Sequence, residues 1–185
     1  MQSEKLVEER ELLSAAAMTS ALSKIVEEIV ARNPDSKRLF FIGIRTGGVF
    51  LAERLRKMTV ERVRHEVPLG VMDITLYRDD IFDALPKPEI GSTDLPCTLE
   101  DHAVVLVDDV LFTGRTIRAA LAELIDFGRP EKVQLAVLLD RGHRELPIQP
   151  DYVGLKVETT REQSVRVFFH ELGEQERAAL FGRSR

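Results

Sequence analysis

The fold of this chain is decided by the stretch Ala103-Val104-Val105-Leu106-Val107-Asp108-Asp109-Val110-Leu111-Phe112-Thr113-Gly114-Arg115-Thr116. Its apolar beginning predicts a strand that is buried on both faces, and the run ends at two adjacent carboxylates. A loop with hydroxyl groups and a glycine follows, and then a helical pattern whose apolar residues fall on one face. In a parallel α/β sheet, ligands bind in the loops after the carboxyl ends of the strands. The free N–H groups and the positive dipole end of the helix therefore predict an anion site here.

The acidic pair narrows the class of ligand. The stretch has neither the lysine of a Walker-type phosphate loop nor the three spaced glycines of a dinucleotide fingerprint. Carboxylates repel a phosphate that touches them, but they accept hydrogen bonds from the sugar hydroxyls beside it. Asp108 and Asp109 thus indicate a sugar 5-phosphate with free 2- and 3-hydroxyls. A buried strand with a capped helix behind it would explain the two elements, but not the acidic pair followed by residues 113–116.

Length and composition fit a single α/β domain over residues 1–185. The chain is 44% hydrophobic and 31% charged, which suits a globular domain with a substantial core. Its one cysteine, Cys97, cannot form an internal disulfide, so we expect a reducing, cytoplasmic setting. No apolar run is long enough to span a membrane, and the polar amino terminus does not fit a signal peptide. The net charge of -5 excludes a basic field over the whole surface but leaves room for a local basic face.

Two further buried strands are followed by loops that suit a binding site. Residues 39–44 form an apolar run before Arg45-Thr46-Gly47-Gly48, a basic and glycine-rich loop. Residues 133–139 form another apolar run before the polar stretch 140–147. Because the loops after parallel strands meet at one edge, we expect an open, mostly parallel sheet flanked by helices, with these loops converging on one site.

The remaining segments complete the expected arrangement. A strand over residues 67–74 leads into a long polar and proline-rich segment, which we expect to be a flexible lid over about 74–99. An apolar stripe at helical spacing predicts a helix over most of residues 3–32. A helical turn or two is expected over residues 174–181, within a C-terminal tail over about 174–185 whose last residues fray.

Three blocks of the sequence together resemble one family. They are Asp73-Ile74-Thr75-Leu76-Tyr77-Arg78-Asp79-Asp80, Val107-Asp108-Asp109-Val110-Leu111-Phe112-Thr113-Gly114-Arg115-Thr116 and Asp140-Arg141-Gly142-His143-Arg144-Glu145-Leu146-Pro147-Ile148. In this order they are similar to the bifunctional pyrimidine-operon attenuation and uracil phosphoribosyltransferase family, whose members have the type I phosphoribosyltransferase fold. The resemblance implies transfer of the 5-phosphoribosyl group from phosphoribosyl pyrophosphate to uracil, which gives UMP and pyrophosphate. It also implies UMP-dependent binding to the leader messenger RNA of the pyrimidine operon, transcription attenuation, and a homodimer or larger homo-oligomer.

The resemblance implies roles for individual residues as well. Asp108 and Asp109 would hold the ribose hydroxyls and act in catalysis, together with Arg78 from the lid. The other implied substrate contacts are the pyrophosphate loop Arg45, Thr46 and Gly47, the stretch Val110, Leu111 and Phe112, the 5-phosphate cradle Thr113, Gly114, Arg115 and Thr116, and the base-side residues Arg141 and Val165. His143 and Arg144 would serve RNA binding, with a locally hydrogen-bonded loop histidine as the alternative for His143. Mg2+ would be held by substrate oxygens and water, without a direct protein ligand.

Two departures from the family pattern bear on function. Gly47 stands where relatives typically carry a second basic residue, which predicts a weaker grip on pyrophosphate. The first helix presents Glu27 and Glu28 outward, and each missing phosphate contact lowers affinity for RNA. Two alternatives therefore stay open. One is an RNA-binding attenuator with little catalytic role, and the other is a phosphoribosyltransferase for a purine or for orotate.

Overall fold

A five-stranded parallel sheet forms the centre of the molecule. The computed structural model describes residues 6–74 and 93–183. The sheet has the order β3-β2-β4-β5-β6, and every neighbouring pair of strands is parallel. Its strands are β2 (Leu39–Ile44), β3 (Leu69–Met72), β4 (Ala103–Leu111), β5 (Lys132–Asp140) and β6 (Tyr152–Lys156). This architecture confirms the predicted α/β fold with a mostly parallel sheet.

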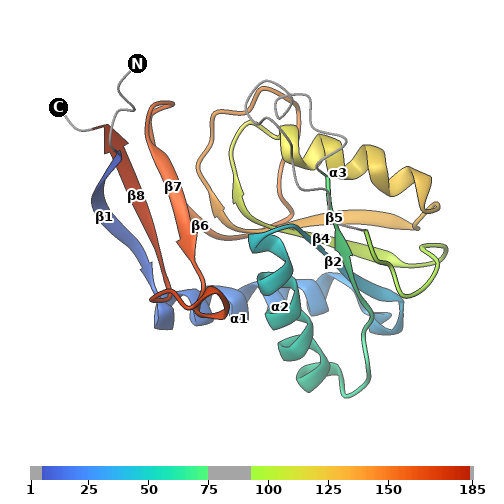
Figure 1. Ribbon diagram of the computed structural model, residues 1–185. Helices are drawn as coiled ribbons and strands as arrows, with labels where there is room; N and C mark the ends of the chain where they lie inside the picture. The colour runs from blue at the N-terminus through green and yellow to red at the C-terminus, as the bar shows by residue number, and fades with distance from the viewer. Residues whose placement is uncertain (1–5, 75–92, 184–185) are drawn as a thin grey trace.

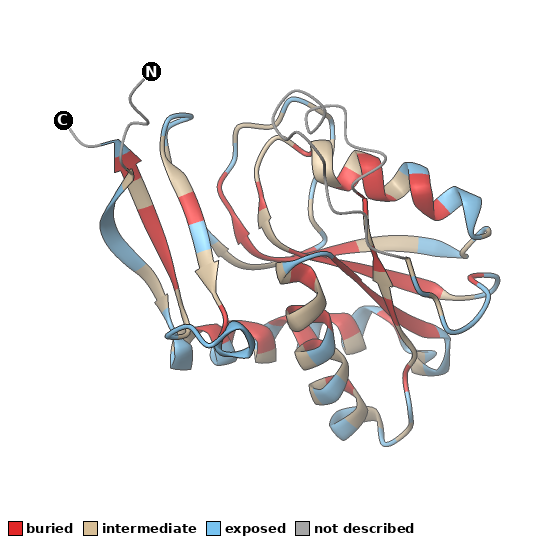
Figure 2. Cartoon of the chain, viewed as in Figure 1, coloured by how far each residue is buried: buried red, intermediate tan, exposed pale blue. Residues whose placement is uncertain are grey.

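Helices cover both faces of this sheet (Figure 1). The helices are α1 (Ala15–Arg32) and α2 (Gly47–Val63) on one face and α3 (Arg115–Asp126) on the other. Along β4, Val105 and Val107 join the core with α1 and α2, whereas Val104 and Leu106 join the core with α3. Burial on both faces explains why the strand is apolar from Ala103 to Val107, up to the two carboxylates (Figure 2). Within residues 6–74 and 93–183, no helix has the length and apolar character needed to cross a membrane.

The two ends of the chain build a second, antiparallel sheet with the order β1-β8-β7. Its strands are β1 (Leu6–Ser14), β7 (Ser164–Phe168) and β8 (Arg177–Arg183). Short 3-10 helices lie elsewhere in the chain, η1 (Ser36–Arg38) before β2 and η3 (His170–Leu172) between β7 and β8. Figure 1 shows this terminal sheet to one side of the central sheet.

Two helical predictions are wrong, and both concern the terminal sheet. The first helix begins at Ala15 rather than near residue 3, because residues 6–14 form β1. The expected terminal helix over 174–181 is largely the strand β8. Leu6 of β1 pairs with Arg183 of β8, at the opposite end of the sequence. Pairing between such distant segments overrides the local helical pattern of each one.

The expected lid lies mostly outside the described residues, and Arg78 is among those not described. The described part that follows is joined to β3, since Val71 and Asp94 exchange main-chain hydrogen bonds of 2.9 and 2.8 Å. The Thr93 hydroxyl accepts a hydrogen bond from the Asp73 N–H (3.0 Å) and donates one to Glu123 of α3. The two ends of this segment are therefore held together beside α3.

Candidate active site

The acidic pair lies at the carboxyl end of β4, in the middle of the central sheet. Asp108 is buried and Asp109 is partly buried. Asp108 Oδ1 accepts a hydrogen bond from the Asp109 N–H (3.0 Å), and Asp109 Oδ1 accepts one from the Val110 N–H (2.9 Å). Burial raises the pKa of the Asp109 carboxyl, and the hydrogen bonds from Val110 and Asp108 offset only part of that rise. Because the main chain orients both carboxylates, the pair is preorganised to accept hydrogen bonds from hydroxyl groups.

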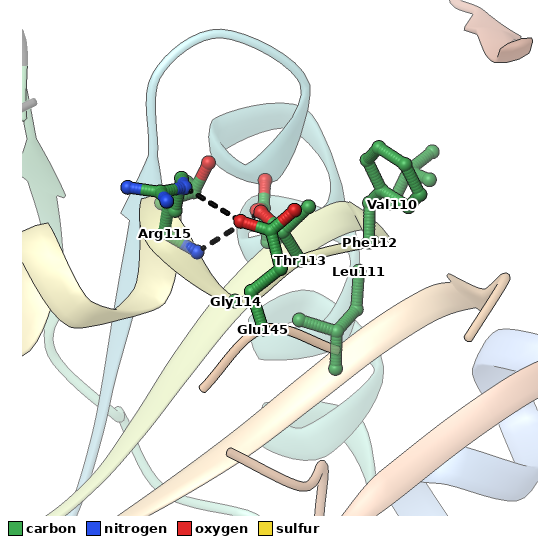
Figure 3. Close-up of a pocket in the computed structure, with 9 residues that line it drawn as sticks. Val110, Leu111, Phe112, Thr113, Gly114, Arg115 and Glu145 are labelled. Carbon is green, nitrogen blue, oxygen red and sulfur yellow. Dashed lines mark hydrogen bonds and ion pairs between the residues drawn. The ribbon is translucent and has the colours of Figure 1, made fainter. Parts of the chain in front are cut away.

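The loop after the acidic pair forms a cavity at the amino end of α3 (Figure 3). Gly114 precedes the helix with a φ of 92°, a conformation that glycine adopts without strain. The cavity has a volume of about 320 Å³ and is lined by Asp108, Val110, Leu111, Phe112, Thr113, Gly114, Arg115, Thr116 and Glu145. All of these residues except Glu145 were predicted from the sequence. The helix amino terminus and Arg115 make the cavity suitable for a phosphate group.

Glu145 is the lining residue that sequence reasoning missed. It belongs to the loop after β5, yet its N–H donates a hydrogen bond to the Thr113 carbonyl (2.9 Å). One oxygen of its carboxylate accepts a hydrogen bond from Arg115 Nε (2.9 Å), and the other accepts one from Arg161 Nη1 (3.2 Å). The hydrogen bond and charge of Arg115, assisted by Arg161, lower the pKa of Glu145. Its place in the block 140–148 was visible in the sequence, but the contact with the cradle was not.

The predicted pyrophosphate loop, residues 45–47, lies directly against the acidic pair. The exposed Arg45 guanidinium lies 3.8 Å from the Asp73 carboxylate, and the peptide bond between Arg45 and Thr46 is cis. Gly47 begins α2 directly against Asp109, since a Cβ atom at Gly47 would lie 2.5 Å from Asp109 Oδ2. A side chain at residue 47 would therefore require the acidic pair to shift. The glycine allows the basic loop and the acidic pair to touch.

Arg141 directly follows β5 and makes most of its contacts within the protein. It is buried, and its Nη2 donates hydrogen bonds to the carbonyls of Thr160 (2.9 Å) and Gln163 (2.6 Å). The guanidinium carbon stands 4.0 Å from the centre of the Phe112 ring, and burial lowers the pKa of Arg141. Arg141 also lines an open cavity of about 630 Å³ beside the end of β6. Its contacts fix the segment that leads into β7, the strand that carries Val165.

His143 and Arg144 also make internal contacts. His143 Nε2 is 2.6 Å from the Thr159 carbonyl oxygen. Arg144 Nη2 donates a hydrogen bond to the Asp140 carboxylate (2.6 Å), and its Nη1 donates one to the Phe112 carbonyl (2.8 Å). These bonds join the loop after β5 to Phe112. The Arg144 guanidinium therefore makes most of its contacts within the protein.

The central sheet therefore brings the acidic pair, the cradle and the Arg45 loop to one edge. Val165 lies on the terminal sheet, in the strand β7 that contacts β4. In the described part of the chain, no group of three or more histidine, cysteine, aspartate and glutamate side chains is placed to enclose a metal ion.

Comparison of the sequence with known proteins gives a consistent result. The model of the phosphoribosyl transferase domain family matches residues 9–176. A relative from Thermus thermophilus, described as bifunctional protein PyrR, is 49% identical over 173 residues, which cover 94% of this chain and 96% of the relative. Proteins with the same description from Syntrophobacter fumaroxidans and Geobacter sp. are 48% and 51% identical, and the matches cover 88% and 85% of this chain and 87% and 89% of the relatives.

Solved structures share the fold at low sequence identity. A hypoxanthine phosphoribosyltransferase from Staphylococcus aureus aligns with a TM-score of 0.67 and 19% identity, covering 96% of this chain and 93% of that chain. A hypoxanthine phosphoribosyl transferase from Trypanosoma cruzi aligns with a TM-score of 0.72 and 15% identity, covering 99% and 95%. At this level of identity the likeness concerns the fold alone.

Proposed function

The chain belongs to the phosphoribosyl transferase domain family, in the branch of the bifunctional PyrR proteins, and on that premise we propose that it is a uracil phosphoribosyltransferase. It transfers the 5-phosphoribosyl group of phosphoribosyl pyrophosphate to uracil and releases UMP and pyrophosphate. The observation that carries the proposal is the meeting of an acidic pair, a cavity at a helix amino end and a basic loop at one edge of the sheet. Each of these three features matches a different part of phosphoribosyl pyrophosphate.

The sugar-phosphate half of the substrate fits the loop after β4. Asp108 and Asp109 accept hydrogen bonds from the two ribose hydroxyls, and the main-chain bonds that orient both carboxylates support this role. The 5-phosphate enters the cradle at the amino end of α3, where Thr113 and Thr116 offer hydroxyl groups and Arg115 offers a positive charge. Holding the ribose at two points orients its anomeric carbon toward the incoming base.

The pyrophosphate half fits the Arg45 loop. Arg45 neutralises part of the charge of the departing pyrophosphate, and Arg78 joins it as a clamp from the lid. The transition state has oxocarbenium character, as in glycosyl transfer generally, so no covalent nucleophile is required. Mg2+ carried by the substrate would supply further charge neutralisation at the departing pyrophosphate. The carboxylates of Asp108 and Asp109 are hard oxygen donors, which suit an ion held mainly by substrate oxygens and water.

The uracil lies on the side of the molecule where β7 approaches β4. Main-chain groups near Val165 contact the base there, and Arg141 supports the segment from which β7 begins. The hydrogen-bonding edges of purines and of orotate also suit main-chain groups, so these bases are the alternatives to uracil.

A steady-state assay with phosphoribosyl pyrophosphate, Mg2+ and one base at a time tests this function. We expect turnover with uracil and far less turnover with hypoxanthine, guanine or orotate. Preference for a purine or for orotate would keep the enzyme class and replace the base. No turnover with any base, in a folded protein that binds UMP, would favour the attenuator with little catalytic role.

We propose UMP-dependent binding to pyrimidine-operon leader RNA as a second role, because the relatives are described as bifunctional. His143 and Arg144 make internal contacts, so we expect the RNA surface to include other residues besides this pair. A gel-shift titration with the leader RNA at low salt, with and without UMP, tests the role. Binding that strengthens with UMP supports it, and no binding at low salt removes it.

A further inference from the structure

We propose that the Glu145 carboxylate occupies the arginine end of the 5-phosphate cradle when no phosphate is bound, and that an incoming phosphate displaces it from Arg115. The inference rests on the proposed function, because it assigns a competitor to the site that the 5-phosphate takes. It makes Glu145 a residue that sets the affinity and charge selectivity of the cradle.

Glu145 lies next to the cradle, although it belongs to the loop after β5. A main-chain hydrogen bond to the Thr113 carbonyl (2.9 Å) fixes this residue against the cradle loop. The side chain then reaches across to Arg115, and Nε of that arginine is 2.9 Å from one carboxylate oxygen (Figure 3). Glu145 thus lies in the wall of the cavity and is not a distant surface residue.

A carboxylate and a phosphate are both oxygen anions that a guanidinium binds through charge-assisted hydrogen bonds. Two such anions at one arginine repel each other, so phosphate binding at Arg115 disfavours the contact with Glu145. The phosphate carries more charge and is also favoured by the positive dipole end of α3.

A second arginine, Arg161, is available to the displaced carboxylate. Its other oxygen already accepts a hydrogen bond from Arg161 Nη1 (3.2 Å). The Arg161 side chain is 62% exposed and can follow the carboxylate outward. Glu145 can therefore exchange Arg115 for Arg161 without being left unpaired. This second arginine lowers the cost of displacement but does not remove it.

The consequence is selectivity by charge. A ligand with a dianionic phosphate displaces Glu145, whereas a ligand without a phosphate leaves the Glu145–Arg115 contact in place. Glu145 should thus weaken the binding of UMP but not the binding of uridine. A residue that only holds Arg115 in position would have the opposite effect on UMP.

Glu145→Gln tests the proposal, because it keeps the size of the side chain and removes its charge. We expect isothermal titration to give UMP binding about two- to fivefold tighter than in the wild-type chain, the range of one exposed ion pair. Uridine affinity should be unchanged. Glu131→Gln is the matched control, since Glu131 pairs with Arg38 at 2.9 Å, is half-exposed, and precedes β5 at the opposite end of that strand. It removes the same charge and should leave both affinities unchanged.

The outcomes separate the inference from the proposed function. If the wild-type chain binds UMP and Glu145→Gln binds it equally well or more weakly, the inference is overturned. The proposed function then still stands. Equal gains in Glu145→Gln and Glu131→Gln would assign the effect to net charge and also overturn it. A wild-type chain that neither binds UMP nor turns over uracil removes the proposed function, and the inference with it.

Discussion

The central sheet and the terminal sheet of this molecule are stabilised in different ways. In the central sheet, β2 is buried at every residue, and glycine lets α2 approach the backbone of β4. In the terminal sheet, β1 exposes most of its residues, and Arg177 of β8 forms hydrogen bonds of 2.6 and 2.8 Å to Glu8 of β1. The first sheet depends on close packing, whereas charged contacts that solvent weakens contribute to the second. We expect the contacts with ribose and phosphate at the closely packed central sheet, and the contacts with the base at the terminal sheet.

The largest effect should follow from the chemistry at the central sheet. Asp109→Asn removes a carboxylate that we propose accepts a hydrogen bond from a ribose hydroxyl. We expect turnover with uracil to fall by about two to three orders of magnitude, as when one preorganised transition-state contact is lost. Steady-state kinetics with uracil, phosphoribosyl pyrophosphate and Mg2+ measure this loss.

Asp101→Asn provides the control for that experiment. Asp101 is an exposed residue that precedes β4, at the opposite end of the strand from the acidic pair. It has a φ of 63°, a conformation that asparagine also tolerates. Turnover should remain at the wild-type level. Near-normal turnover in Asp109→Asn would place the ribose contacts elsewhere.

The next effect concerns packing and should differ between the two sheets. A Cβ atom at Gly48 would overlap the main-chain carbonyl oxygen of Val107 in β4, which cannot move aside easily. We expect Gly48→Ala to lower the free energy of unfolding by about 1–3 kcal/mol, measured by urea denaturation.

Gly182→Ala is the matching change in the terminal sheet. A Cβ atom at Gly182 would meet the end of the Glu9 side chain, which is exposed and flexible. This variant should stay within about 0.5 kcal/mol of wild type. Equal losses in the two alanine variants would show that the terminal sheet is packed as rigidly as the central one.

The same difference explains how much of the fold the sequence could predict. The apolar runs of β2, β4 and β5 reflect burial on both faces, a local property that a strand carries in its own residues. The strand β1 lacks such a run, since it is largely exposed and rich in glutamate, and the apolar run of β8 is short. Their strand conformation depends on pairing with each other across almost the whole chain, which no local pattern records.

The residues of the candidate site also differ in how far the sequence could predict them. The cradle could be predicted because Asp108 to Thr116 are contiguous and carry their chemistry in one motif. Glu145 was missed because its role arises from a side chain that crosses from another loop. The internal hydrogen bonds of Arg144 could not be foreseen either, since they depend on where Phe112 and Asp140 lie after folding.

A smaller effect should come from breaking the link between α2 and the segment that joins β7 to β8. Arg54 of α2 donates hydrogen bonds to Glu171 of η3 (2.9 and 2.7 Å) and also to Glu176. Arg54→Met leaves both carboxylates without this partner, and we expect a loss of about 1–2 kcal/mol in urea denaturation. The control is Arg62→Met on the same helix, whose pair with Glu27 is half-exposed and 3.3 Å long. A loss as small as that of Arg62→Met would mean that the two sheets are joined mainly by apolar contacts.

The smallest effect is a difference in pH dependence between the two regions. Burial raises the pKa of Asp109, so its ionised form costs stability, and this cost grows as pH rises through the raised pKa. Burial opposes ionisation of Glu171 as well, but the hydrogen bond and charge of Arg54 outweigh it and lower the pKa. The stability that Glu171 contributes is therefore present above its unfolded pKa of about 4.3 and is lost as pH falls through the lowered folded value.

The variants Asp109→Asn and Glu171→Gln should consequently shift stability in opposite directions at pH 7. Asp109→Asn should be more stable than wild type, because it removes a buried charge, and the gain should vanish below about pH 4. Glu171→Gln should be less stable by less than about 1 kcal/mol, since solvent screens much of this pair, and its deficit should also vanish in acid. Thermal unfolding at several pH values measures both differences. A stability loss at pH 7 in both variants would contradict this prediction. It would mean that the hydrogen bonds to the acidic pair stabilise it by more than burial destabilises it. The central sheet would then tolerate a buried charge as well as the terminal region does.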